Sequence, residues 1–126
     1  MRDLLRTVSI QVVELGPQSE ITLIRLKGVL DADTAPDLAK VIDDLLGKKR
    51  YNFIIDLEGV EYISSNGWAV FASCLKQIRQ NGGDLKLVQI LPDIYKVFEL
   101  LEFHRIFRTY SSVEEAMRDF LVARKS

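Results

Sequence analysis

The sequence has little of the chemistry on which metal proteins and disulfide-linked proteins depend. Its 126 residues include one cysteine, Cys74, and one histidine, His104. A lone cysteine cannot form an internal disulfide, and one thiol with one imidazole provides too few ligands for a transition-metal site. We therefore expect no metal site and no disulfide, and a reducing cytoplasm fits this cysteine content.

The chain also lacks a strong charge of either sign and a long apolar run. Lys and Arg number 17 against 18 Asp and Glu, which gives a formal net charge of -1. This balance provides no electrostatic footprint for nucleic acid or for an anionic membrane. No apolar run approaches the ~20 residues that cross a bilayer, and residues 1–6 carry charges where a signal peptide has its apolar region. We expect a cytoplasmic protein with no direct nucleic-acid binding and no membrane insertion.

Common catalytic and nucleotide-binding motifs are missing too. There is no G-x-S-x-G elbow, which disfavours a serine hydrolase built from Ser64 or Ser65 with His104. Gly82 and Gly83 follow a predicted helix, so they indicate a helix C-cap and turn, not a phosphate-binding loop. The aspartates around the first predicted helix lack EF-hand spacing, and caps and exposed helix faces explain them better. We expect a protein that is not an enzyme and needs no cofactor.

What the chain does contain is the composition and periodicity of one small domain. Hydrophobic residues make up 48% and charged residues 28%, which suits one folded domain over residues 1–126 with its core at about 8–121. Strands are predicted at 8–14, 21–27, 51–57, 85–90 and 104–110, and helices beginning near 34, 66, 92 and 112. This α/β order predicts a mixed β-sheet with an opening antiparallel hairpin, then parallel crossovers. About four helices should flank it, largely on one side.

Local signals mark several ends of these elements. Thr34 with Asp37, and Ser112 with Glu115, have the spacing of a capping box and should begin helices. Gly28 is expected to end the second strand.

The most informative stretch joins the third strand to the second helix. It reads Val-Glu-Tyr-Ile-Ser-Ser-Asn-Gly-Trp-Ala-Val-Phe at residues 60–71. Ser64 and Ser65 are both candidate N-caps, because a hydroxyl can accept a hydrogen bond from an unpaired amide of the first turn. A phosphate on either serine would lie beside these amides and the positive end of the helix dipole. Chemistry alone does not choose between them, and a purely structural cap is the alternative.

Trp68 lies on a helix start that is apolar on nearly all sides. One interpretation is a core position. The other is that part of this surface, with Phe71, stays exposed as a partner interface, where tryptophan is a favoured anchor.

The ordered set of motifs resembles the STAS domain family, and specifically its bacterial anti-sigma factor antagonists. Residues 56–67 are similar to the family signature, and residues 28–31 to the Gly-x-Leu-Asp feature that ends the second strand. The turn at 81–83, the helix after Pro92 and the capped last helix are also similar. The resemblance covers about residues 8–121.

Position by position, the resemblance assigns a slot to each residue of the serine segment. Ser65 occupies the phosphoacceptor slot, Asn66 the small-residue slot and Gly67 the glycine slot. Two positions depart from the family pattern: Ser64 stands where aspartate is usual, and Trp68 where leucine is usual.

The resemblance implies a phosphorylation-switched binding module. Unmodified, it would bind an anti-sigma factor serine kinase and so release a sigma factor. The kinase would phosphorylate Ser65, with Ser64 as the alternative, and a PP2C-type phosphatase would reverse the reaction. The implied partner-binding residues are Asp31, Ser64, Ser65, Asn66, Gly67 and Trp68.

Other readings stay open. The main alternative is a non-phosphorylated STAS subunit of a transporter or signalling assembly, docked through the helix with Trp68 and Phe71. A weaker one is a small-molecule sensor. The expected oligomeric state is a monomer or weak dimer.

Overall fold

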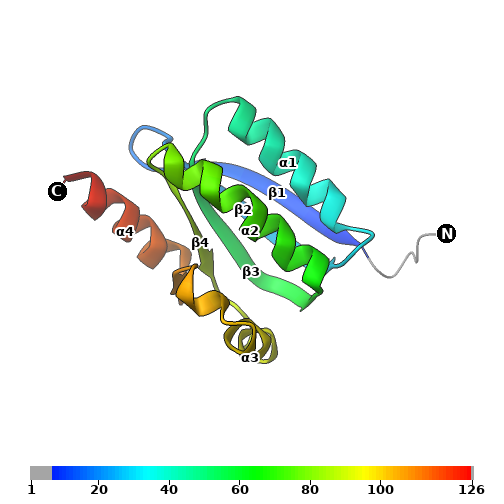
Figure 1. The fold of residues 1–126 in the computed structure, drawn as a ribbon. Coiled ribbons are helices and arrows are strands. Elements are labelled where there is room, and N and C mark those ends of the chain that lie inside the picture. The colour runs from blue at the N-terminus through cyan, green and yellow to red at the C-terminus, as the bar shows by residue number, and fades with distance from the viewer. Residues whose placement is uncertain (1–6, 126) are drawn as a thin grey trace.

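The computed structural model describes residues 7–125 and contains one sheet flanked by helices (Figure 1). In chain order the elements are β1 (Val8–Leu15), β2 (Ile21–Leu30), α1 (Ala35–Gly47), β3 (Asn52–Ile63), α2 (Ser65–Gln80), β4 (Asp84–Val88), α3 (Pro92–Leu100), the 3-10 helix η1 (Phe103–Arg105), β5 (Thr109–Tyr110) and α4 (Val113–Lys125). The charged residues 1–6, which bore on targeting, lie outside the described part. None of the described helices is long and apolar enough to cross a bilayer.

The sheet has five strands in the order β1-β2-β3-β4-β5. β1 and β2 pair antiparallel, and the other neighbours pair in parallel. This confirms the mixed sheet with an opening hairpin. The four helix-linked strands point the same way, so the segments that follow β2, β3 and β4 gather at one edge of the sheet. We call it the carboxyl edge.

Strand alternation divides the core between the two faces of the sheet. On β2, Ile24 belongs to the larger apolar cluster, which α1, α2 and α3 cover, whereas its neighbour Leu23 belongs to a smaller cluster under α4. Three helices therefore share one face, as expected, and α4 alone covers part of the other. The start of α2 and the end of β3 lie together at the carboxyl edge (Figure 1).

β2 and β3 both run further than the sequence predicted. Gly28 does not end β2, because the strand continues to Leu30 beside an extended β3. Gly28 adopts φ 112°, and the register of β2 against β3 shifts between Gly28 and Val29. Glycine tolerates this backbone conformation at no steric cost. Glycine often ends a strand, but Gly28 lies within β2 and forms a local irregularity there.

The prediction of a strand over residues 104–110 is largely wrong. Only Thr109 and Tyr110 pair with β4, and His104 lies in η1. The amide of Phe107 donates to the carbonyl of Phe103 at 3.0 Å, and the two rings lie 6.1 Å apart. Residues four apart lie on the same side of a helical turn, and here that side faces the core. The apolar residues here were therefore assigned the wrong period.

The capping box at the last helix is half confirmed. The amide of Glu115 donates to Ser112 Oγ at 3.1 Å, but the Glu115 carboxylate reaches back to Ser111, where it accepts from the amide at 3.3 Å. The reciprocal bond is displaced by one residue from its usual place.

Candidate functional site

The candidate site forms at the carboxyl edge, where β2 and β3 end. Leu30, the last residue of β2, pairs with Ile63, the last residue of β3. The amide of Ser64 donates to the Leu30 carbonyl at 2.9 Å. This bond holds the start of α2 against the turn after β2, so that Asp31 and the serine segment lie at one edge.

Ser64 is the N-cap of α2. Its backbone is extended, and its Oγ accepts from the amide of Gly67 at 3.4 Å. Its carbonyl accepts from the amide of Trp68 at 3.1 Å. The half-buried Ser64 hydroxyl is thus engaged in beginning the helix.

Ser65 differs from its neighbour although both are serines. It is the first residue of α2 and is exposed, as is Asn66. Within residues 7–125 its hydroxyl makes no hydrogen bond. An exposed hydroxyl without an internal partner is available to another molecule.

The charge around Ser65 in the sequence is acidic. Residues 58–75 contain Glu58 and Glu61 and no lysine or arginine. Both glutamates are exposed. A phosphate on Ser65 would meet the amides at the helix start but no basic side chain from its own segment.

Gly67 is a packing residue. It is buried, and a Cβ placed there would lie 2.8 Å from Ile63 Cγ2 and 2.9 Å from Leu30 Cγ. The close approach that glycine permits is therefore made by the ends of β2 and β3, not by a ligand. A role of Gly67 in partner binding stays a prediction, and its buried position indicates that any such role is indirect.

Trp68 is also a core residue, which corrects its prediction as an exposed anchor. Its side chain is 1% exposed. Its ring lies 5.5 Å from that of Phe98 and 5.3 Å, stacked, from that of Phe103. Phe71 is buried beside it. The helix start is apolar all round because α3 and η1 cover the side that the sheet leaves open.

Asp31 directs its carboxylate into its own turn. Its Oδ1 accepts from the amides of Asp33 at 3.0 Å and Thr34 at 3.2 Å. Thr34 does not cap α1 with its side chain as predicted; its hydroxyl donates to the Val29 carbonyl at 2.8 Å and accepts from the Asp31 amide at 2.8 Å. Asp31 is 5% exposed, so its carboxylate shapes the turn after β2, and its predicted role in partner binding stays a prediction.

Tyr62 is the exposed aromatic residue that sequence reasoning missed. It is 49% exposed near the end of β3, three residues before Ser65. Val60 pairs with Gly28 and Tyr62 with Val29, so Glu61 is an extra residue in the ladder. Strict alternation from the buried Val60 would place Tyr62 in the core. The extra residue reverses that, and only the paired strands reveal it.

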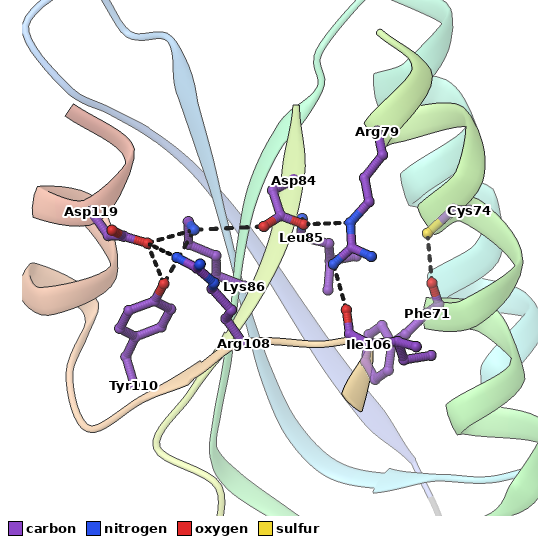
Figure 2. Close-up of polar contacts among 10 residues, drawn as sticks. All are labelled: Phe71, Cys74, Arg79, Asp84, Leu85, Lys86, Ile106, Arg108, Tyr110 and Asp119. Atoms are coloured by element: carbon purple, nitrogen blue, oxygen red, sulfur yellow. Dashed lines mark hydrogen bonds and ion pairs between the residues drawn. The ribbon is translucent and has the colours of Figure 1, made fainter. Parts of the chain in front are cut away.

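A second polar cluster joins β4, β5 and α4 (Figure 2). Lys86 Nζ lies 2.8 Å from Asp119 Oδ2 and 3.6 Å from Asp84 Oδ2. Tyr110 donates its hydroxyl hydrogen to Asp119, and Arg108 Nη1 lies 3.4 Å from the same carboxylate. We call Lys86, Asp84, Arg108, Tyr110 and Asp119 the lysine cluster.

The ionisation in the lysine cluster follows from these contacts. Hydrogen bonds from Lys86 and Tyr110 lower the pKa of Asp119 to about 2. Burial alone would lower the pKa of Lys86, but its hydrogen bonds with Asp119 and Tyr110 outweigh burial and raise it. Lys86 also lies 4.6 Å from the ring centre of Phe120. The cluster is a paired network that fastens α4 to the sheet.

Neither metal nor thiol chemistry is indicated in the described part of the chain. Residues 7–125 contain no group of three metal-ligating side chains that could hold an ion. Burial raises the pKa of Cys74 to about 11, and its thiol donates to the Phe71 carbonyl at 3.3 Å (Figure 2). At neutral pH this thiol is protonated and inert.

Comparisons with known proteins agree with this architecture. A family model described as the STAS domain matches residues 13–116. The candidate anti-sigma factor antagonist BtrV of Bordetella bronchiseptica is 34% identical over 98 residues, which cover 78% of this chain and 84% of that protein.

Solved structures share the fold. An anti-sigma factor antagonist from Mycobacterium paratuberculosis has a TM-score of 0.79 at 20% identity, over 89% of this chain and 92% of that one. The Bacillus cell fate determinant SpoIIAA in its phosphorylated form has a TM-score of 0.69 at 19% identity, over 89% and 99% of the two chains. The family match, the identity to BtrV and the shared fold show that this chain belongs to the STAS domain family.

Proposed function

We propose that this protein is a cytoplasmic anti-sigma factor antagonist whose binding is switched at Ser65. It acts as one STAS domain and as a binding module, not as an enzyme. In its unmodified form it sequesters a kinase-type anti-sigma factor and thereby releases a sigma factor. The kinase phosphorylates Ser65, and a PP2C-type phosphatase restores the hydroxyl.

The observation that carries the proposal is the unequal state of two adjacent serines. Ser64 Oγ is engaged as the helix cap, whereas the Ser65 hydroxyl is exposed and unbonded within the described residues. A kinase needs an accessible hydroxyl, so Ser65 fits the acceptor role. The names of the relatives, including one solved in a phosphorylated form, support the antagonist role, whereas the choice of Ser65 rests on its exposed hydroxyl.

Electrostatics explains how the modification would act. A phosphate adds about -1.5 to -2 charges at pH 7. The amides at the start of α2 can stabilise this charge locally, so the domain need not refold. The segment already carries two exposed glutamates and no cation of its own. The added charge therefore opposes an acidic or nucleotide-bearing partner, and a loss of ~3 kcal/mol lowers affinity more than a hundredfold.

Tyr62 and Asn66 complete the proposed contact surface. Both are exposed and flank Ser65 in the chain. Tyrosine is a favoured interface anchor because its ring buries a large area while its hydroxyl keeps a hydrogen bond. In this role Tyr62 takes the place predicted for Trp68.

The alternative, a permanently docked subunit, loses its proposed surface. It required Trp68 and Phe71 on the outside of α2, and both are buried. A docked subunit would also bind its partner whatever the state of Ser65. The two functions therefore differ in one measurable respect, the dependence of binding on charge at residue 65.

A capture experiment from the host lysate tests the proposal. The baits are the wild type, Ser65→Ala, Ser65→Asp and Ser73→Asp, with captured proteins identified by mass spectrometry. Ser73 is a matched control because it is an exposed serine on the same helix. We expect the wild type, Ser65→Ala and Ser73→Asp to retain a protein with a serine-kinase fold, and Ser65→Asp to lose most of it. Equal capture by all four baits would refute the switch.

A further inference from the structure

The two outermost strands of the sheet, which form its lateral edges, are unequal in length. β1 forms one edge and β5 the other. β1 has eight residues, each paired with β2 from Val8–Gly28 to Leu15–Ile21 without a register shift. β5 has two residues. β1 is therefore a long, regular edge strand, and its outer backbone groups have no strand partner within residues 7–125.

β1 lacks the features that usually prevent an edge strand from pairing with another chain. Such edges are protected by proline, lysine, bulges or short length. β1 reads Val-Ser-Ile-Gln-Val-Val-Glu-Leu, with no proline, glycine, lysine or arginine. Its single charged residue is Glu14, close to one end.

The side chains of β1 also leave apolar surface open. Val8, Ile10, Val13 and Leu15 are half-buried, and Val12 is 43% exposed. Val8 and Ile10 pack against the larger cluster, and Val13 and Leu15 against the smaller one. A further strand beside β1 would extend the covered apolar surface on both faces of the sheet.

We propose that β1 pairs antiparallel with β1 of a second copy of this chain, which joins two sheets into one. A twofold axis perpendicular to the sheet relates the copies, as in an isologous dimer. This symmetry keeps corresponding faces on the same side. Even-numbered residues then lie opposite even-numbered residues, as the pleat requires.

Charge favours a second copy as the occupant. The twofold axis can pass beside either of the two middle residues of β1, Gln11 or Val12. Glu14 then lies opposite Val8 or Ile10 of the other copy, respectively. The two Glu14 carboxylates then lie on rungs at least ~14 Å apart along the strands, so neither register brings like charges together. Val12 lies opposite Val12 or Ile10 and gains apolar cover near the axis.

The interface is small, which determines its strength. β1 has only eight residues, so we expect one pair of these strands to bury no more than the low end of the ~1,200 to 2,000 Å² that stable complexes bury. The dimer should therefore be weak, with a dissociation constant in the range of about 10 μM to 1 mM. Because the strands pair antiparallel, the carboxyl edges of the two copies point in opposite directions. Each Ser65 stays accessible, and one dimer can hold a partner at each end.

Sedimentation velocity on the full chain tests the pairing, over about 10 μM to 1 mM. The variants are Val12→Lys and, as a matched control, Val97→Lys on α3, because both valines are 43% exposed. We expect the wild type and Val97→Lys to show a sedimentation coefficient that rises with concentration. Val12→Lys should stay monomeric, because two lysines would meet near the axis. Circular dichroism checks that both variants fold.

Amide hydrogen exchange at low and high protein concentration identifies the surface that pairs. We expect concentration-dependent protection in β1, at alternate residues, and unchanged exchange in α2. A wild type that remains monomeric at about 1 mM overturns the proposal. So does a dimer that Val12→Lys leaves intact, or protection confined to elements other than β1.

Discussion

The carboxyl edge around Ser65, called here the Ser65 edge, and the lysine cluster are both polar regions beside the same sheet, but they are built in opposite ways. In the lysine cluster each charged group has an opposite charge nearby, and Lys86 is 5% exposed. At the Ser65 edge the hydroxyl is exposed and unbonded within residues 7–125, and its own segment offers no cation. Polar groups with internal partners stabilise the fold, whereas polar groups without them are available for recognition.

The contrast also explains why the strongly shifted pKa values lie in the lysine cluster and not at the candidate switch. Strongly shifted pKa values often mark active sites, but structural ion pairs shift them too. Here the lowered pKa of Asp119 belongs to the helix attachment. The candidate switch is the Ser65 hydroxyl, and the feature that identifies it is its exposure to solvent.

The largest effect should appear when the two serines are tested for phosphorylation. With the partner kinase and ATP, Ser65→Ala should abolish incorporation of phosphate, because it removes the accessible hydroxyl. Ser64→Ala should remain a substrate while losing about 1 kcal/mol of folding stability with its cap. Peptide mass spectrometry and urea unfolding measure the two results. Phosphate on Ser64, or retained in Ser65→Ala, would show that the acceptor has been assigned to the wrong serine.

Removing a charge from the lysine cluster should act on stability alone. Asp119→Asn keeps the shape but removes the nearer of the two carboxylates beside the buried Lys86, leaving Asp84 at 3.6 Å, and this should cost about 2 kcal/mol. Affinity for the anti-sigma partner should not change. Urea unfolding and a binding titration on the same sample separate these effects. A loss of affinity without a loss of stability would reverse the roles given to the two regions.

Removing the exposed aromatic residue should have the converse effect. Tyr62→Ala should weaken partner binding about tenfold, which corresponds to about 1.4 kcal/mol, and leave the unfolding free energy almost unchanged. Leu100→Ala is the control, because Leu100 is an exposed apolar residue on α3, 81% accessible. If both variants bind like the wild type, Tyr62 is not part of the contact surface.

The smallest effect should be the acid response of the lysine cluster. The pKa of Asp119 is lowered from 3.8 to about 2 in the folded state. A depressed carboxyl pKa adds stability that is fully present above the unfolded value and is lost as pH falls through the folded value. The contribution should therefore fade between pH ~4 and ~2. It should be modest, because the side chain is 35% exposed and solvent screens it.

Unfolding free energies of the wild type and Asp119→Asn at several pH values measure this term. The difference between them should shrink as pH falls through that window. A constant difference down to pH ~2 would mean that the pairing of Asp119 with Lys86 does not contribute in the folded state.

Much of the fold followed from local patterns. Runs of β-branched residues and helical spacing predicted the element order, the opening hairpin and the mixed sheet, because these depend on periodicity and turn residues. The placement of Ser65 at the start of α2 was predicted in the same way. The same reliance on local patterns explains the strand wrongly predicted at His104, because a short apolar run does not distinguish a strand from a helical turn.

The tertiary structure decided what each residue near Ser65 is available to do. Trp68 is buried because Phe98 and Phe103, distant in sequence, pack on it. Tyr62 is exposed because an extra residue enters the ladder between β2 and β3. Ser64 and Ser65 have the same chemistry, and the folded chain distinguishes them: Ser64 is half-buried with its cap bond to Gly67, whereas Ser65 is exposed. The sequence by itself determined where the candidate site lies, whereas the exposure or burial of its residues depends on contacts between segments that no local pattern contains.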